Sequence, residues 1–284
     1  MKKTLPSPIY ATIAGFCLFA ISMCLARVAY GPLIPSMINT EWVTKAEAGY
    51  LGAFNGLGYI VGCLMALWLP QITGIRLLMR SSLILAVIGI GMCFWNLGFA
   101  WLSLGRFLSG SGAAIMVIHT TALVVRSFNE KSKEQLLGFA ISGGGIAIVI
   151  ISMSLPYFVK NGPSDGWLLE AIITLFVALI AWPFISTVPH QRQPSKEAIQ
   201  PLESRRGRLV LLTGISYLLM SISILPHTLF MTDYMHRDLG LSVGDSSSLF
   251  AVLGLGCAFG AIFVGMLTRL FGTRMSLFIS YIIG

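Results

Sequence analysis

The sequence is poor in charged residues, which make up 11% of its 284 positions, whereas hydrophobic residues make up 56%. Ordinary soluble domains carry roughly a quarter charged residues. Because the surface of a soluble protein has to be covered by polar groups, this excess of apolar residues does not fit into one soluble core. The composition therefore excludes an ordinary soluble globule and predicts a polytopic membrane protein, whose apolar side chains face lipid.

Cysteine is scarce as well, and the five cysteines show no pairing. All of them fall within apolar stretches, far from any C-x-x-C spacing, so we expect them to act as small buried hydrophobes. We therefore predict no disulfide, no metal site and no cofactor. The cysteines are Cys17, Cys24, Cys63, Cys93 and Cys257.

Apolar runs of about 20 residues, the length that crosses a bilayer, recur along the chain. The first run follows Lys2 and Lys3 but is too long for the apolar part of a signal peptide, so we expect an uncleaved first span. A ninth run begins near Met275 and ends after about 15 Å of helix, half a crossing, so we interpret the chain as C-terminally truncated. The eight full predicted spans cover residues 9–37, 46–69, 77–96, 98–125, 136–158, 167–186, 209–231 and 245–268.

Lys and Arg residues are unevenly distributed among the predicted loops. If the N-terminus is on the inner side, the outer loops hold only Lys45, Lys160 and Arg237. Arg27 and Arg106 lie within spans, and every other Lys and Arg falls on the inner side. This bias follows the positive-inside rule and predicts a multi-pass protein of the inner (plasma) membrane with a cytoplasmic N-terminus. It also explains the net charge of +8 without a nucleic-acid partner.

The segment 187–208 divides the chain after six predicted spans, because its prolines and many ionised residues exclude a span. Leu51–Arg76 aligns without a gap onto Leu249–Arg274, and both copies contain Gly-Leu-Gly-x-x-x-Gly followed by Gly-x-Arg. Two parallel repeats of this kind are typical of secondary transporters. We predict a six-helix N-terminal bundle over 1–186, a basic cytoplasmic linker over 187–208, and an incomplete second bundle over 209–284.

The loops after the second and eighth predicted spans resemble the signature G-x-L-x-D-R-x-G-R-R of the major facilitator superfamily (MFS). A glycine and the final arginine of that signature occur in both copies, while Gln71 and Arg269 stand where the family has an acidic residue. In the family that carboxylate helps to hold the two halves together on the inner side. The resemblance implies a gating role between the bundles for Gly74, Arg76, Gly272 and Arg274.

The fourth predicted span is similar to the pattern R-x-x-x-G-x-G-A-A of the same superfamily, with Arg106 and Gly110 at its first two fixed positions. The first 125 residues are similar to the YbfB/YjiJ-type branch of bacterial MFS permeases. The resemblance implies an all-α membrane protein with the MFS fold. It also implies a permease that moves a small-molecule substrate across the bacterial inner membrane by alternating access, coupled to H⁺ or another ion.

Two arginines lie within predicted spans, where an ionised side chain is costly unless it faces water or a partner. At 1.5 Å per residue, Arg27 and Arg106 lie roughly 12–15 Å below the outer boundary. The nearest carboxylates, those of Glu170 and Asp233, are placed near the outer ends of their spans, so two cations without a carboxylate favour an anionic solute. Packing and backbone capping by the arginines are the alternative, and His227 fits either the cavity or interfacial water. The candidate cavity residues are Arg27, Tyr30, Asn55, Arg106, Gly110 and His227.

Proline and glycine mark two further features of the predicted spans. Pro32 and Pro35 lack a backbone N–H, so we expect the outer end of the first span to kink or loosen. The glycines at 143–145 favour a close contact between helices.

Two other classes of protein compete with a transporter. An intramembrane enzyme needs a His-Glu-x-x-His helix, a pair of membrane carboxylates, or a serine that faces a histidine. Ser111 and His119 lie on one predicted helix without a supporting motif, so an enzyme is disfavoured. A non-transporting remnant of a permease stays open, because the second predicted bundle stops early. The substrate, the coupling ion and the oligomeric state do not follow from these residues.

Overall fold

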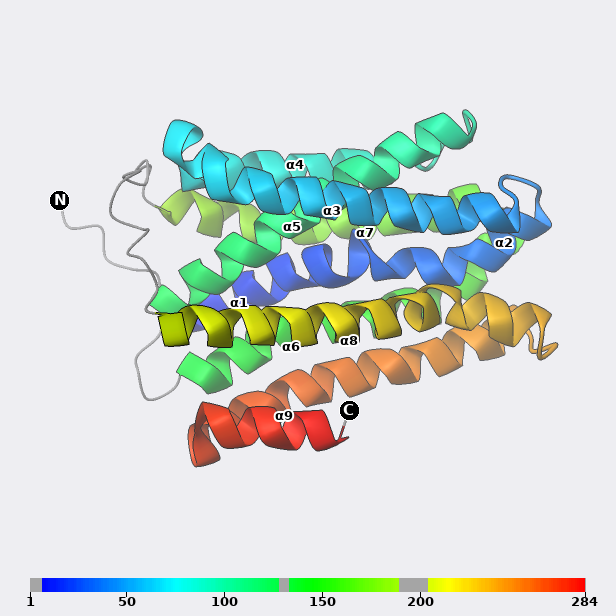
Figure 1. Cartoon of the computed structure of the whole chain (residues 1–284). Coiled ribbons are helices and arrows are strands. Elements are labelled where there is room, and N and C mark those ends of the chain that lie inside the picture. The colour runs from blue at the N-terminus through cyan, green and yellow to red at the C-terminus, as the bar shows by residue number, and fades with distance from the viewer. Residues whose placement is uncertain (1–6, 128–132, 189–203, 284) are drawn as a thin grey trace.

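The predicted spans form long helices that lie side by side in a computed structural model of the chain (Figure 1). The structure describes residues 7–127, 133–188 and 204–283. Within that part of the chain all regular elements are helices, as the sequence predicts. In chain order they are α1 (Pro8–Phe19), η1 (Ala20–Leu25), η2 (Val28–Leu33), α2 (Ile34–Asn39), α3 (Lys45–Thr73), α4 (Ile75–Met92), α5 (Phe99–Arg126), α6 (Lys133–Phe158), η3 (Val159–Asn161), α7 (Pro163–Thr187), α8 (Ser204–Arg237) and α9 (Val243–Ile283).

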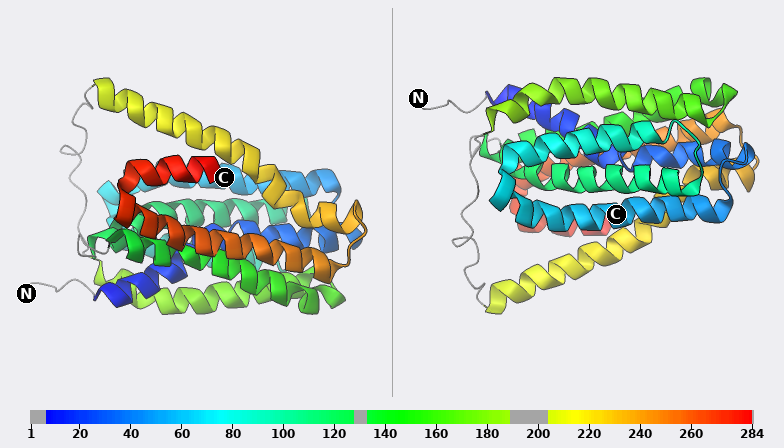
Figure 2. Two further views of the ribbon diagram at one scale, coloured as in Figure 1. Left: turned by 90° about the horizontal axis from the view of Figure 1, so that it is seen from below. Right: turned by 90° about the horizontal axis from the view of Figure 1, so that it is seen from above.

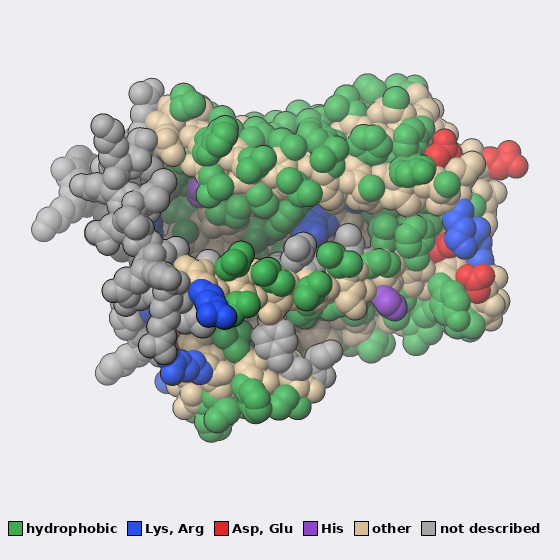
Figure 3. All heavy atoms as spheres, viewed as in Figure 1, with side chains coloured by type: hydrophobic (Ala, Val, Ile, Leu, Met, Phe, Trp, Pro, Cys, Tyr) green, Lys and Arg blue, Asp and Glu red, His purple; other side chains and the backbone are tan. Residues whose placement is uncertain are grey.

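Seven helices within the described residues are long and apolar enough to cross a membrane. Large apolar side chains cover the outside of these helices (Figure 3), with Trp68 on α3 71% exposed. Such a surface is stable against lipid and not against water. A multi-pass membrane protein is therefore confirmed. The helix α8 covers the predicted seventh span but is not among the seven, so the count of eight full spans stays a prediction.

The helices alternate in direction, so the bundle has two ends (Figure 1). The chain enters at the end that also holds Gly74 and Gly272, which we call the N-terminal end. The opposite, distal end holds the connections at 40–44, 93–98 and 238–242. At the distal end α8 lies against η2 and α2, and it leans away from the bundle toward the N-terminal end (Figure 2).

The helices that contain the two copies of the sequence repeat, α3 and α9, both begin with a side-chain cap. At the start of α3 the Thr44 hydroxyl accepts a hydrogen bond from the Glu47 backbone N–H at 3.2 Å, and the Glu47 carboxylate accepts one from the Thr44 N–H at 2.8 Å. At the equivalent place before α9, the Ser242 hydroxyl accepts a hydrogen bond from the Asp245 backbone N–H at 3.1 Å and donates one to the Asp245 carboxylate at 2.6 Å. The short polar residue and the acid three positions later therefore fix the helix start in both copies.

The two copies also end in the same way. Gly74 after α3 has φ 81° and ψ 151°, and Gly272 within α9 has φ 78° and ψ 165°. This backbone conformation is open almost only to glycine. The chain turns back at Gly272 and continues as a helix to Ile283 (Figure 1). Gly272 lies three residues before Met275, where the sequence predicts the ninth span to begin.

The first span loses regular α-helical geometry in its outer part, around the prolines, as predicted, but the break itself lies nearer the middle of the span. The span changes from the wide turns of η1 to the tight turns of η2 at Arg27, which has φ −138° and ψ −66°. Pro32 lies inside η2 and cannot donate the hydrogen bond that a regular helix would need there. The break lies at the depth of Arg27 itself, closer to the middle of the span than the two prolines.

Glycines let the helices approach closely in two places. A Cβ atom at Gly58 of α3 would overlap the carbonyl oxygen of Phe107 on α5. A Cβ at Gly138 of α6 would lie 2.6 Å from the carbonyl oxygen of Ala261 on α9, and Gly145 of the predicted 143–145 contact also packs against α9. The α6–α9 contact joins the predicted first and second bundles. The domain boundaries at 186 and 208 stay predictions, and the linker lies largely outside the described residues.

Replacing Gly74 by alanine tests the turn that ends α3. The Gly74→Ala change should destabilise the protein by about 1–3 kcal/mol, since a Cβ makes this backbone conformation costly. The matched control is Gly91→Ala, because Gly91 is helical with open space around it and should be neutral or stabilising by up to about 1 kcal/mol. Thermal unfolding of both variants in detergent measures the difference, and equal midpoints would contradict the role of Gly74.

Candidate functional site

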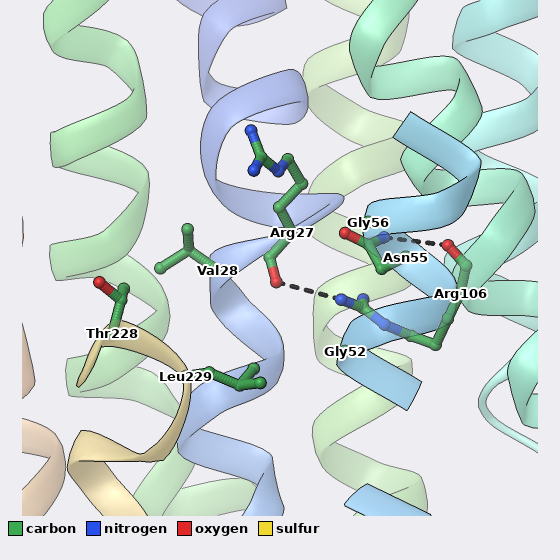
Figure 4. Close-up of a pocket in the computed structure, with 8 residues that line it drawn as sticks. All are labelled: Arg27, Val28, Gly52, Asn55, Gly56, Arg106, Thr228 and Leu229. Atoms are coloured by element: carbon green, nitrogen blue, oxygen red, sulfur yellow. Dashed lines mark hydrogen bonds between the residues drawn. The ribbon is translucent and has the colours of Figure 1, made fainter. Parts of the chain in front are cut away.

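A small pocket lies where the broken first span meets α3, α5 and α8 (Figure 4). The cavity volume is about 60 Å³, which is enough for a few water molecules. Three of the sequence-predicted cavity residues line it, namely Arg27, Asn55 and Arg106. The full lining is Arg27, Val28, Gly52, Asn55, Gly56, Arg106, Thr228 and Leu229.

Arg106 is held almost completely out of solvent, with 1% of its surface exposed. One of its Nη atoms donates a hydrogen bond to the backbone carbonyl of Arg27 at 3.1 Å (Figure 4). Its guanidinium carbon lies 4.7 Å from the ring centroid of Tyr30 and 6.0 Å from that of Trp167. The two aromatic faces and the carbonyl together stabilise a buried cation.

Asn55 connects three elements at the same depth. Its amide nitrogen lies 2.9 Å from the carbonyl oxygens of both Ala26 and Arg106 and 3.1 Å from the Ser109 hydroxyl. The carbonyls of residues 26 and 27, beside the break, thus accept hydrogen bonds from α3 and α5. Asn55 therefore ties the break in the first span to the two helices that line the pocket with it.

Arg27 is half-buried and differs from Arg106 in its surroundings. Its guanidinium lies 4.3 Å from the centroid of the Tyr59 ring. Its side chain points away from the guanidinium of Arg106 (Figure 4). Within the described part of the chain it forms no ion pair.

The pocket is closed toward the distal end by α8. A Cβ at Gly31 would lie 3.2 Å from the carbonyl oxygen of Leu229, and one at Gly52 would lie 2.6 Å from the Leu229 side chain. Farther out, the Asn39 amide contacts the His236 ring at 3.4 Å. Figure 3 shows that the surface between α3 and α8 is hollowed toward the N-terminal end.

The interpretation that no carboxylate lies at the depth of the arginines is wrong. Glu170 is fully buried and interacts electrostatically with Arg106. Glu170 is seven residues after Pro163, the start of α7, and Arg106 is seven after Phe99, the start of α5. Both helices start at the distal end, so both charges lie about 10 Å below it. The predicted spans begin at 98 and 167, which puts Arg106 eight residues and Glu170 only three residues into their spans, so the sequence does not show the shared depth.

Asp233 is the second of the two carboxylates that the sequence places nearest to the arginines. It is buried at the end of α8 and is bound by Arg237, whose Nε donates to its carboxylate at 2.7 Å. Its charge is therefore neutralised within its own helix.

The remaining predicted cavity residues lie around the pocket and not in it. Tyr30 is fully buried behind Arg106, and its hydroxyl donates to the carbonyl of Ala48 at 3.0 Å. Gly110 packs against the backbone of Asn55. His227 is exposed in a separate apolar groove on α8, beside Pro226 and Phe230.

The predicted gating residues lie at the N-terminal end. Arg76 donates to the carbonyl of Val188 at 2.6 Å, after the end of α7, and Arg274 is exposed. Arg269, in the place of the family's acid, donates to the Gln135 side chain on α6 at 2.7 Å. In the second copy of the signature, the residue in the acid's place is thus a cation that binds a neutral amide.

A bundle of long apolar helices with a sequence repeat, a broken first span and polar groups at mid-depth is typical of the membrane-spanning part of secondary transporters. The chain belongs to the family described as "Uncharacterised MFS-type transporter YbfB", which matches residues 19–284. This family membership confirms the resemblance found in the sequence.

Two solved structures have the same fold. A bacterial homologue of the human lysosomal transporter Spinster, in an inward-facing and unoccupied conformation, is 20% identical with a TM-score of 0.68. The match covers 95% of this chain and 64% of that protein, so the chain spans less than two thirds of its length. A D-xylose–proton symporter is 15% identical with a TM-score of 0.65, over 93% of this chain and 69% of its own. No curated protein sequence matches the chain.

Substituting Asn55 tests whether its amide holds the break in the first span. The Asn55→Ala change removes the amide donor to the carbonyl of Ala26 and one of the donors to the carbonyl of Arg106, which the Ser109 hydroxyl also binds, and should cost about 1–3 kcal/mol of stability. The control is Asn161→Ala at an exposed position near α7, where the cost should stay within about 0.5 kcal/mol. Thermal unfolding in detergent measures both, and a neutral Asn55→Ala would show that the break does not depend on this amide.

Proposed function

We propose that the protein is a secondary active transporter that moves a small anionic solute across the bacterial inner membrane by alternating access, coupled to an ion gradient. The N-terminus would be cytoplasmic, as the distribution of Lys and Arg predicts. Membership of the MFS-type transporter family supports this function. The inward-facing conformation of the Spinster homologue and the proton symport of the D-xylose transporter agree with it.

The observation that carries the proposal is the position of Arg27. It stands at a helix break, lines a pocket between the N-terminal spans and α8, and has no acidic partner among the described residues. A half-buried cation of this kind attracts an anion from water. Arg106, which is buried among aromatic rings and backbone, would position Arg27 and would not itself contact the solute.

Alternating access would come from motion of α8 against η2 and α3. In the conformation described, Leu229 closes the pocket toward the distal end, while α8 leans away toward the N-terminal end (Figure 2). With a cytoplasmic N-terminus this is an inward-facing arrangement. Separation of Leu229 from Gly31 and Gly52 would open the pocket to the other side.

A bulky residue at position 52 should hold the distal contact open. Gly52→Trp should expose the pocket to the distal side, because the indole needs the space that Leu229 fills. The reporter is Gly56→Cys, which lines the pocket and has open space for a side chain. We expect a membrane-impermeant maleimide added on the distal side to label the reporter roughly tenfold faster, as a shift of about 1.4 kcal/mol between conformations would give.

The labelling is done in a background in which Cys63 and Cys257, the least buried native cysteines, are replaced by serine. Gly91→Trp, at an open position away from the contact, is the control and should leave the labelling unchanged. Equal labelling from both sides without Gly52→Trp would contradict alternating access.

Removing the charge of Arg27 should weaken anion binding. A panel of small organic and inorganic anions is screened by thermal shift, where an anion at 100 times its Kd stabilises by about 2.7 kcal/mol. Arg27→Gln should reduce the affinity for a stabilising anion about tenfold or more, since a charged hydrogen bond contributes roughly 1.5–3 kcal/mol. The fold should survive, because Arg106 binds the backbone carbonyl of Arg27 and not its side chain.

Lys160→Gln removes an exposed cation at the distal end and is the matched control. It should leave anion binding unchanged, and Arg27→Lys should retain part of it. Uptake of the same anion into proteoliposomes then separates a transporter from a non-transporting permease remnant. Stabilisation that is equal in wild type and Arg27→Gln would refute the anion site.

A further inference from the structure

Among the described acids, Glu170 is the one whose carboxyl group is fully buried and forms neither a hydrogen bond nor an ion pair. It has no exposed surface, and neither of its oxygens accepts a hydrogen bond. Within the described residues it forms no ion pair. A carboxylate in this situation is strongly disfavoured, whereas a neutral carboxylic acid is tolerated.

Unsatisfied donors surround the same place. Arg106 interacts electrostatically with Glu170, yet its Nε and one Nη make no hydrogen bond. The indole nitrogen of Trp167, one helical turn before Glu170, is also without a partner. If Glu170 were ionised, attraction in this apolar interior would draw it into hydrogen-bonded contact with the guanidinium. The absence of that contact favours a neutral carboxyl group.

The other polar groups near Glu170 are not candidates for binding or releasing a proton at this place. The thiols of Cys24 in η1 and Cys93 after α4 interact with it, and both are buried and neutral. The Tyr30 hydroxyl of η2 is already bound to the Ala48 carbonyl. Arginine keeps its charge in proteins, so Arg106 stays a cation. Among the described groups, Glu170 is therefore the one that changes protonation state here.

We propose that Glu170 is a proton-binding site whose occupancy alternates with the conformation of the transporter. A proton from water adds to one carboxylate oxygen, an O–H bond forms, and the net charge of the Glu170–Arg106 pair changes from zero to +1. Release of the same proton reverses the step and breaks no other bond. The site holds its proton while Leu229 closes the distal end.

Arg106 makes this a site for a proton and not for a metal cation. Its guanidinium repels a second cation, and one carboxyl group supplies too few oxygens to replace the hydration shell of a metal ion. A proton needs only one of the two oxygens. The same guanidinium can pair with the carboxylate once the proton leaves, which stabilises the released state.

Opening of the distal end links the proton to solute movement. When α8 separates from η2 and α3, water reaches Arg27 and the Arg106 layer behind it, the carboxylate becomes hydrated, and the proton dissociates toward that side. This coupling role rests on the proposed transport function. Protonation of Glu170 in the closed conformation does not rest on it and is measured without any solute.

Infrared spectroscopy of the full chain in lipid nanodiscs tests the protonation. At neutral pH wild type should show the carbonyl band of a protonated carboxylic acid, with its isotope shift in D₂O, and Glu170→Gln should lose that band. Asp165→Asn, which removes a partly exposed acid on the same helix, is the control and should keep it. Identical spectra for wild type and Glu170→Gln overturn the proposal.

Glu170→Asp is the second variant, to be used if Glu170→Gln does not fold. It keeps the carboxyl group but shortens the side chain, so the band should persist at a shifted frequency. A band at an unchanged frequency in Glu170→Asp belongs to another acid and overturns the assignment.

Gly52→Trp tests the link between the proton and the conformation. Once maleimide labelling shows this variant open to the distal side, its band should be lost at a pH where wild type retains it. A band that persists in the open variant overturns the coupling role. Since no solute is present, failure of the anion experiments with a positive infrared result refutes anion transport and leaves the proton site standing.

Discussion

The cation of Arg106, buried among helices, is the constraint on which the site depends. A guanidinium at this depth has to be stabilised by acceptors and aromatic faces, because water is absent. A regular helix offers few free acceptors, since its carbonyls bond within the helix. The break in the first span provides the Arg27 carbonyl, and the stacked rings of Tyr30 and Trp167 cover the rest. The break, the arginine and the rings form one arrangement.

That arrangement separates the roles of two arginines that the sequence treats alike. Both lie in predicted spans at similar depth and both line the pocket, but Arg106 is almost fully buried whereas Arg27 is half-buried. Asn55 joins them, because it binds the carbonyls of Ala26 and Arg106 at once. A movement of α8 against the first span would therefore shift Arg27 directly. It would shift Arg106 and Glu170 through the backbone at the break.

The repeat explains why α3 and α9 begin and turn in similar ways. The two helices nevertheless pack against different neighbours. Thr44 and Ser242 cap equivalent helices, and Gly74 and Gly272 end them with nearly the same dihedral angles. These are local effects that a short stretch of sequence determines. The glycines inside the helices depend on neighbours: Gly58 meets the backbone of α5, whereas Gly256 has open space around it.

The sequence by itself determined the membrane class, the helical fold, the family and the break in the first span, because composition, span length and proline chemistry act locally. It also placed Arg27, Asn55 and Arg106 in one region, since motifs on adjacent spans fix their depth. Only the tertiary structure decided that Arg106 is enclosed, that Gly110 supports Asn55, and that Glu170 lies beside the arginine. Those properties depend on the rotation of each helix and on which neighbour it meets, and apolar helices with weak amphipathic patterns leave that rotation to packing between helices.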